Sequence, residues 1–306
     1  MIAAGLDLGG TKIEAQVFAD DWSIAATRRV DTPTDYAALI ASIIGLIDWI
    51  EEVAGRSGDG PLPVGIGAAG VIDPHTGLAL TANLCASGRP LPADIDREAG
   101  RAITFINDAR AFTLSEAIFG AGRGHRSVLA LILGTGVGGG IAIDGALRDG
   151  ATGAGGEFGH CSAPAALVTA HALPVVRCGC GRMGCVETYL SGAGMARLGR
   201  ALTGSTLTPR EIAARATDAS RRVHDVWCAM VADLLRNLVL TADPDVVVLG
   251  GGLSQIAGLV ADLTESARAA QLGGLAMPPI VLAQGGATSG ARGAAYAAWR
   301  GARDGR

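Results

Sequence analysis

The chain has 306 residues, a length that favours about two domains of ordinary size. Glycine is in excess, with 46 residues, yet 49% of the chain is hydrophobic, which excludes collagen-like and disordered classes and indicates large buried cores. The net charge of −4 and the lack of basic runs argue against nucleic acid or an anionic membrane surface as a partner. Because the sequence shows no signal peptide and no bilayer-spanning stretch, we expect a cytoplasmic protein.

The first elements are a strand pair and a helix. Residues 2–8 are predicted to form a buried strand and residues 12–18 an alternating one, joined by a turn at Gly9-Gly10-Thr11. Apolar residues at three- and four-residue steps then predict an amphipathic helix capped by Thr34 or Asp35.

Two more strands are expected before the middle of the chain, at residues 63–68 and 103–106. The second leads into Asn107-Asp108 and a helix over residues 109–119. Ligands of α/β sheets bind where strands end, and a carboxylate there can take a proton from a substrate hydroxyl. The alternative role of Asp108 is a helix cap.

The opening pattern then returns. A strand at 128–133, a turn at Gly134-Thr135-Gly136 and a returning strand that includes 140–143 repeat the N-terminal order. This repetition predicts two related α/β halves with a boundary near residues 120–126.

The second half alternates helices and a strand. Helices are predicted over 186–202 and 220–242, followed by a strand at 245–249 that leads into Gly250-Gly251-Gly252. A helix is expected from Ser254, and a last one over 289–299.

The glycine-rich turns suit phosphate, because backbone amides without Cβ atoms can close on an oxyanion. Asp7 would then reach a magnesium ion or its waters, and Thr11 and Thr135 would donate hydroxyl groups. The glycine run at 250–252 suits a nucleobase and ribose. Tight hairpins and a crowded strand-to-helix turn are the alternatives, and neither P-loop nor dinucleotide spacing is present.

A cysteine cluster follows a glutamate–histidine pair, Glu157 and His160. Three cysteines and a histidine form one of the regular four-ligand zinc sets. A redox pair and ordinary buried cysteines are alternatives, and His171 is a rival fourth ligand because it is nearer in sequence. The cysteines of the cluster are Cys178, Cys180 and Cys185, with Glu187 close behind.

Taken together, these segments resemble the ROK family of sugar kinases and regulators over nearly the whole chain. Six segments carry the resemblance. They are 6–12 (LDLGGTK), Asn107-Asp108, 133–140 (LGTGVGGG), 157–160 (EFGH), 178–187 (CGCGRMGCVE) and 244–252 (PDVVVLGGG). Within the family, 82–83 (AN) and 87–91 (SGRPL) are most similar to the sugar loop of the N-acetylglucosamine kinases, whereas Ala69 stands where many members have proline.

The resemblance implies an α/β, actin-like or hexokinase-like (ribonuclease H-like) fold of two domains with a central ligand cleft. The N-terminal domain would comprise residues 1–119 joined by a C-terminal helix at 289–306, and the C-terminal domain, with its zinc segment, residues 120–288. A homodimer is expected from the family.

The resemblance also implies ATP-dependent phosphorylation of the 6-hydroxyl of N-acetyl-D-glucosamine, with ATP and an amino sugar or hexose as ligands. Asp108 would be the catalytic base, Mg²⁺ would accompany ATP, and Zn²⁺ would be structural. The expected substrate-binding residues are Asn83, Ser87, Asn107, Asp108, Glu157, His160 and Glu187, and the expected zinc ligands are His160, Cys178, Cys180 and Cys185. The expected ATP-binding residues are Asp7, Gly9, Gly10, Thr11, Lys12, Gly134, Thr135, Gly136, Gly138, Gly139, Gly251 and Gly252.

Two other functions remain as alternatives. The first is a glucokinase or broad-specificity hexose kinase of the same family. The second is a sugar-responsive regulator, which is disfavoured because the phosphate strand begins at Ile2 and leaves no segment for a helix-turn-helix.

Overall fold

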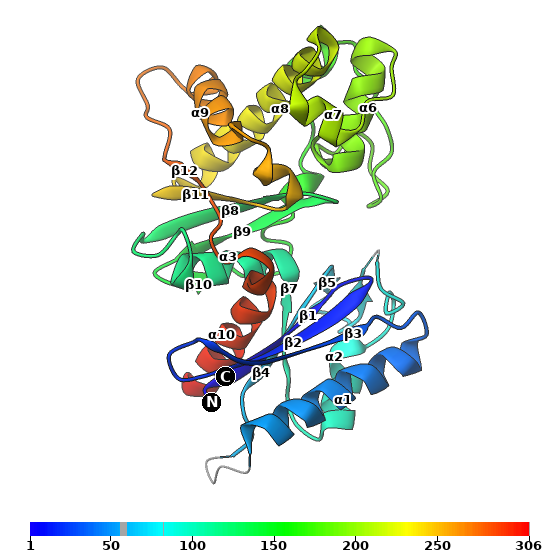
Figure 1. The fold of residues 1–306 in the computed structure, drawn as a ribbon, viewed down its shortest axis with the longest axis vertical. Coiled ribbons are helices and arrows are strands. Elements are labelled where there is room, and N and C mark those ends of the chain that lie inside the picture. Colours follow the sequence, from blue (N-terminus) through cyan, green and yellow to red (C-terminus); the bar gives the residue numbers. More distant parts are fainter. Residues whose placement is uncertain (56–59, 82, 306) are drawn as a thin grey trace. The chain divides into compact units, whose positions relative to one another are not determined.

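The computed structural model describes residues 1–55, 60–81 and 83–305 (Figure 1). Ala82, in the predicted sugar loop, and Arg306, at the end of the predicted C-terminal segment, lie outside the described residues. The chain divides into two compact units, which are treated separately below. The first combines Met1–Gly120, Ala146–Gly155 and Gly285–Arg306, and the second Ala121–Gly145 and Gly156–Gln284. Residues 146–155, which the sequence-based division placed in the C-terminal domain, therefore pack with the first unit.

The first unit is built on a mixed sheet with the strand order β3-β2-β1-β4-β7 (Figure 1). The predicted pair is confirmed as β1 (Ala3–Leu8) and β2 (Lys12–Phe18), which run antiparallel. The predicted strands β4 (Val64–Ala68) and β7 (Thr104–Asn107) extend the sheet in parallel beside β1. The outer strand β3 (Ile24–Asp31) was not predicted, because none of its residues is buried.

One face of this sheet packs against α1 (Tyr36–Ala54) and α2 (Leu91–Ala99), whose apolar side chains share a core with Leu6 and Leu8 of β1. The carboxylate of Asp35 accepts a hydrogen bond from the Ala38 N–H at 3.0 Å and so caps α1, as the sequence predicts. The spacing of the buried residues along α1 confirms the predicted amphipathic helix.

The other face packs against α10 (Ser289–Arg303), the predicted last helix. Gly5 alternates with the core-facing residues of β1 and therefore points to this helix. A Cβ atom on Gly5 would lie 1.9 Å from the carbonyl oxygen of Ala291, and one on Gly65 of β4 would lie 2.0 Å from that of Ala294. The glycines thus allow α10 to lie directly on the strands that carry the candidate site.

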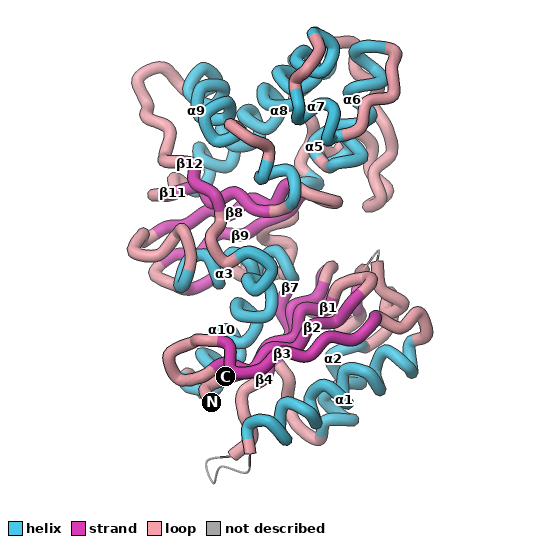
Figure 2. The backbone as a smooth tube through the Cα atoms, in the orientation of Figure 1, coloured by secondary structure: helices cyan, strands magenta, loops and turns pink. Residues whose placement is uncertain are grey.

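The second unit repeats the strand arrangement of the first, with the order β9-β8-β11-β12 among its strands (Figure 2). β8 (Ser127–Leu133) and β9 (Val137–Ile143) are antiparallel, as β1 and β2 are. β11 (Val246–Gly250) runs parallel to β8, as β4 does to β1, and β12 (Ile280–Leu282) follows. The repeat predicted from the sequence is confirmed.

The long helix α8 (Asp218–Ala242) supplies much of the core of the second unit and confirms the predicted helix. The predicted helix over 186–202 is wrong as a single element. It consists of α5 (Glu187–Leu190) and α6 (Gly192–Thr203), because Ser191 is extended and its hydroxyl caps α6 by accepting from the Gly194 N–H at 3.1 Å.

The helix predicted from Ser254 begins later. A 3₁₀ turn at Gly252–Gln255 comes first, and α9 (Leu259–Ala270) starts after Gly258. The remaining elements are α3 (Asp108–Phe119), α4 (Ala165–Ala170), α7 (Pro209–Ala214), β5 (Val71–Ile72), β6 (Ala79–Leu80), β10 (Ala146–Leu147) and 3₁₀ turns at Phe158–His160 and Gly286–Thr288. Across the described ranges, none of the helices has both the length and the apolar character needed to cross a bilayer.

Candidate active site

The hairpin between β1 and β2 presents the first predicted phosphate segment at the surface of the first unit. Thr32 fixes the hairpin, because its hydroxyl donates to the Gly9 carbonyl oxygen at 2.7 Å and its N–H donates to the Thr11 carbonyl oxygen at 3.1 Å. Gly10, Thr11 and Lys12 are exposed, so this turn is open to a ligand. The Lys12 Nζ atom lies 3.9 Å from Glu14 Oε2.

Two carboxylates belong to the ends of strands in this unit. Asp7 is near the end of β1, and Asp108 follows β7 directly. Burial, and then the charge of Asp108, raises the pKa of Asp7 to about 6. Burial also raises the pKa of Asp108. Partly desolvated, mutually repelling carboxylates of this kind are typical of functional sites and attract cationic ligands.

Asn107 is the residue that caps α3. Its Oδ1 atom accepts a hydrogen bond from the Arg110 N–H at 3.1 Å, and its Nδ2 atom donates to the Gly70 carbonyl oxygen at 2.9 Å. Asp108 instead occupies the first turn of the helix, where its Oδ1 atom accepts from the Ala109 N–H at 2.8 Å. The alternative role of Asp108 as the helix cap is therefore wrong, and its carboxylate can serve chemistry.

Asn83 and Ser87, the two predicted residues of the sugar loop, lie between β6 and α2. A Cβ atom on Gly10 would lie 2.9 Å from the Asn83 carbonyl oxygen, which places Asn83 beside the first hairpin. Ser87 is exposed in the turn that precedes α2. Their predicted contacts with sugar stay predictions.

In the second unit, the two predicted nucleotide segments are neighbours. The hairpin at Gly134 closes with a hydrogen bond from its N–H to the Gly136 carbonyl oxygen at 3.0 Å. A Cβ atom on Gly134 would lie 3.7 Å from the Gly252 N atom. Gly251 has φ of +83° and its Cβ would lie 2.3 Å from the Leu133 carbonyl oxygen, so only glycine fits there. Gly138 and Gly139 lie within β9 itself.

Glu187 links the second hairpin to the cysteine cluster. Its Oε2 atom accepts a hydrogen bond from the Val137 N–H at 2.8 Å, and its Oε1 atom lies 3.9 Å from Cys178 Sγ. Glu187 begins α5, only two residues after Cys185. The carboxylate that the sequence assigns to sugar binding therefore also holds the backbone of the hairpin.

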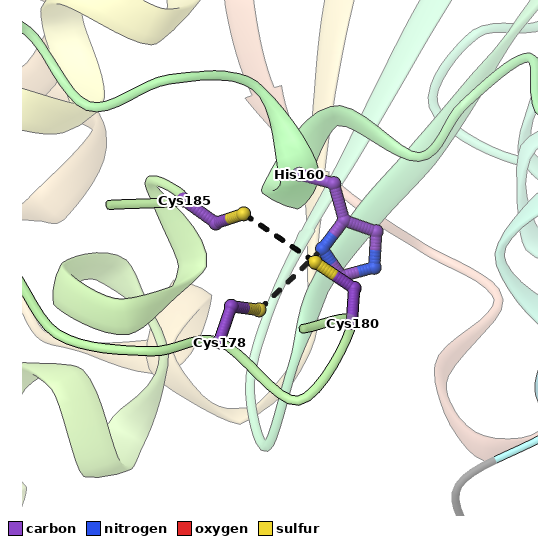
Figure 3. A group of neighbouring side chains, drawn as sticks. All are labelled: His160, Cys178, Cys180 and Cys185. Atoms are coloured by element: carbon purple, nitrogen blue, oxygen red, sulfur yellow. Dashed lines mark hydrogen bonds between the residues drawn. The ribbon is translucent and has the colours of Figure 1, made fainter. Parts of the chain in front are cut away.

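The predicted zinc ligands gather in the second unit (Figure 3). One potential ligand atom from each of His160, Cys178, Cys180 and Cys185 lies within 4.8 Å of the others. The Sγ atoms of Cys180 and Cys185 are 3.6 Å apart, and Cys178 Sγ lies 3.7 Å from His160 Nδ1. His171, the rival ligand, ends α4 and is not in the cluster that the described residues form.

His160 turns its two ring nitrogens to different neighbours. Nδ1 faces the thiols, and Nε2 lies 3.6 Å from Glu157 Oε2. An acidic neighbour on the second nitrogen is a common way to orient a metal-binding histidine. Glu157 precedes a short 3₁₀ turn that ends at His160, and such a turn brings residues three apart to the same side.

Thr32, Thr81 and Arg110 were not identified from the sequence. Thr32 holds the first hairpin, whereas Thr81 and Arg110 line a pocket beside Asn107. Thr32 and Thr81 are single hydroxyls in loops, and Arg110 is one of many arginines, so no local pattern distinguishes them.

Comparison with known proteins places these features in one family. The ROK family profile matches residues 3–300. An N-acetyl-D-glucosamine kinase of Photobacterium profundum is 40% identical over 299 residues, with 95% of this chain and 97% of the relative covered. An N-acetylgalactosamine kinase, AgaK, of a Shewanella species is 39% identical over 296 residues, with 95% and 94% covered.

Solved structures of ROK proteins also resemble this chain. A ROK hexokinase from Thermus thermophilus has a TM-score of 0.86 at 32% identity and covers 99% of this chain and 100% of its own. A ROK family glucokinase from Streptomyces griseus, solved with glucose and AMPPNP, has a TM-score of 0.76 at 31% identity, with 98% and 100% covered. The likeness confirms the predicted actin-like α/β fold class. The chain belongs to the ROK family.

Proposed function

We propose that this protein transfers the γ-phosphoryl group of ATP to the 6-hydroxyl of N-acetyl-D-glucosamine. The observation that carries the proposal is the carboxylate of Asp108, which follows β7 and is relieved of the capping role by Asn107. Relatives named N-acetyl-D-glucosamine kinase, at 40% and 38% identity over 95% of this chain, support the substrate.

Asp108 would accept the proton of the attacking hydroxyl. Burial raises the pKa of this carboxylate, and a more basic carboxylate removes a hydroxyl proton more readily. Phosphoryl transfer otherwise asks the protein for positioning and for stabilisation of charge. In the first unit, backbone at Gly9 and at the exposed Gly10 and Thr11 would supply phosphate contacts. In the second unit, the exposed Thr135 would offer its hydroxyl group.

Residues of the second unit would hold the nucleoside. Gly251 and Gly252 adjoin the second hairpin, where backbone without Cβ atoms lets a nucleoside approach closely. Mg²⁺ that accompanies ATP would neutralise phosphate charge, and Asp7, a buried carboxylate with a raised pKa, would hold the ion or its waters. Lys12, the single lysine of the chain, provides a cation on the first hairpin.

The donor set of the cysteine cluster fits zinc. Three thiols and an imidazole nitrogen make a complete tetrahedral set with no open position, so a zinc ion there would have a structural role. His160, Cys178, Cys180 and Cys185 would hold it. Through His160 and Glu187, the cluster would fix the segment proposed to bind sugar and the hairpin proposed to bind phosphate.

Phosphorylation of N-acetyl-D-galactosamine is a second candidate, because a relative at 39% identity is named an N-acetylgalactosamine kinase. The two sugars share the acetamido group and differ only in the configuration of the hydroxyl at C4. A homodimer and a cytoplasmic location stay predictions from the sequence.

Identification of the product tests the proposed reaction. The purified protein is incubated with ATP, Mg²⁺ and N-acetyl-D-glucosamine, and the product is analysed by phosphorus–proton correlation NMR. We expect phosphate coupled to the two protons of C6. Phosphate on another carbon, or none transferred to sugar, would contradict the assignment.

A further inference from the structure

Arg215, in the second unit, directly follows α7 in a backbone conformation that its side chain disfavours. Its φ angle is +51°, in the left-handed region where glycine is the usual residue after a helix. An arginine held there raises the conformational energy, and such strain persists only where the surrounding structure fixes the residue. The contacts of the Arg215 guanidinium group supply that constraint.

This guanidinium group joins the end of α7 to the beginning of α9. Its Nη2 atom donates to the Ala257 carbonyl oxygen at 2.7 Å, and its Nη1 atom donates to Asp262 Oδ2, in the first turn of α9, at 2.6 Å. Hydrogen bonds between charged partners are roughly twice as strong as neutral ones. Asp262 Oδ2 also lies 3.6 Å from Nε2 of His224, a buried residue of α8. One ion pair therefore connects α7, α8 and α9.

The segment that Arg215 holds continues directly from the glycine run proposed to bind the nucleoside. The 3₁₀ turn at Gly252–Gln255 leads to Ala257, so only a few residues separate the two. Ser254 fixes this turn, because its buried hydroxyl donates to the Gly251 carbonyl oxygen at 2.7 Å and its N–H donates to the same oxygen at 3.2 Å. A shift of Ala257 would therefore be transmitted to the glycine run.

The helices α6 and α7 approach the same candidate site from the hairpin at Gly134. The N–H of Gly192, the first residue of α6, donates to the Gly134 carbonyl oxygen at 2.8 Å. A Cβ atom on Gly192 would lie 4.0 Å from Cγ of Pro209, the first residue of α7. Gly134 is also the neighbour of Gly252. Arg215 thus ties the helix beside the hairpin to the helix that follows the glycine run.

We propose that Arg215 is a positioning residue for ATP, which keeps the Gly134 hairpin and the turn at Gly251 and Gly252 at the spacing that the nucleoside needs. This inference rests on the proposed function and adds to it the residue that sets the shape of the nucleoside site. Arg215 acts through the backbone of Ala257 and the carboxylate of Asp262.

The test replaces Arg215 with glycine and with lysine. Arg215→Gly removes both guanidinium contacts and also relieves the left-handed backbone strain, so loss of the side chain is not confounded with strain. Arg215→Lys keeps a positive charge and lacks the planar fork that reaches two acceptors. For each variant, ADP release gives kcat, KM for ATP and KM for N-acetyl-D-glucosamine, and thermal unfolding reports whether the protein folds.

Two control variants change comparable residues away from these contacts. Asp243→Gly makes the same kind of backbone change after α8, where the exposed Asp243 has φ of +42°. Arg222→Ala removes an exposed arginine from α8. Both controls should keep the KM for ATP of the unaltered protein, because surface changes without such contacts have small effects.

We expect Arg215→Gly to raise KM for ATP by about 3–30-fold, the range for residues that act on a site without contacting its ligand. Arg215→Lys should give a KM for ATP between those of Arg215→Gly and the unaltered protein. At saturating ATP, KM for the sugar and kcat should change by less than about threefold, because the lost interaction affects nucleotide binding and not the reacting groups.

An unchanged KM for ATP in folded Arg215→Gly, or an equal rise of KM for ATP and for the sugar, would overturn the role of Arg215 while the proposed function stands. If the unaltered protein transfers no phosphate from ATP to any amino sugar or hexose, the proposed function fails instead. Calorimetric dissociation constants of ADP, for the unaltered protein and Arg215→Gly, then decide whether Arg215 supports a nucleotide site. If Arg215→Gly does not fold, Arg215→Lys decides, since an unaltered KM for ATP contradicts the role.

Discussion

Asp7 is buried next to the charge of Asp108, and burial first and this charge second raise the pKa of Asp7 to about 6. The two carboxylates come from the ends of separate strands of one sheet, so the fold itself sets them against each other. This repulsion lowers the stability of the ligand-free protein, and bound magnesium would offset the negative charge.

The first prediction follows from the burial of Asp7 and its repulsion by Asp108. The pKa of Asp7 is raised in the folded state, so its contribution to stability is present at low pH and is lost as the pH rises through about 6. Asp7→Asn should therefore stabilise the ligand-free protein at pH 7.5, by about 1–3 kcal/mol, while lowering kcat strongly. Urea unfolding and ADP release measure the two effects. Asp48→Asn, on the exposed face of α1, is the control. A destabilised Asp7→Asn protein would contradict the account.

The second prediction distinguishes the catalytic role of Asp108 from the capping role of Asn107. Asp108→Asn should lower kcat by about 10²–10⁴-fold without lowering the unfolding free energy, because it removes a buried charge that also repels Asp7. Asn107→Ala should instead lower stability by about 0.5–2 kcal/mol through loss of the cap, in addition to any effect on turnover. Steady-state kinetics and chemical denaturation of both variants check the distinction. Near-normal turnover of a folded Asp108→Asn protein would show that another group removes the proton.

The third prediction concerns the cysteine cluster. The purified protein should contain about one zinc ion per chain, and Cys180→Ser should lose it together with much of the thermal stability. Cys161→Ser changes an exposed cysteine outside the cluster and should keep the metal. Elemental analysis and melting curves before and after chelation measure both properties. Equal zinc content in the two variants would contradict the ligand set.

The fourth prediction concerns His224, a buried residue of α8. Burial lowers its pKa, with the charge of Arg215 adding to the effect and Asp262 and Asp225 opposing it. The unfolded chain therefore binds the proton more readily, and stability should fall as the pH drops below about 6.5. His224→Gln should reduce this pH dependence, whereas His125→Gln, on an exposed residue, should not. Parallel pH slopes for wild type and His224→Gln would count against this origin.

Helices and strands could be predicted where apolar residues recur at the spacing typical of that element. β1, β2 and α1 are rich in buried apolar residues, which the sequence displays directly. β3 could not be found, because it is an exposed outer strand without that period. The break at Ser191 depends on a single capping hydroxyl inside an otherwise helical pattern.

The candidate site could be predicted in its motifs and not in its contacts. Spacing alone left His160 and His171 open as metal ligands, and only the folded chain brings His160 beside Cys178. Likewise, the sequence does not show that Asn107 caps α3 and leaves Asp108 available for catalysis, because this depends on which side chain accepts from the Arg110 N–H. The pocket walls come from strands distant in sequence, so Thr81 and Arg110 carried no local signal.

The relative rates with a panel of sugars test the central claim most directly. ADP release is measured at limiting concentrations of N-acetyl-D-glucosamine, N-acetyl-D-galactosamine, glucose and fructose. The account predicts the highest kcat/KM for N-acetyl-D-glucosamine, with glucose at least about 10-fold lower. An equal or higher value for glucose would contradict it and favour a hexose kinase.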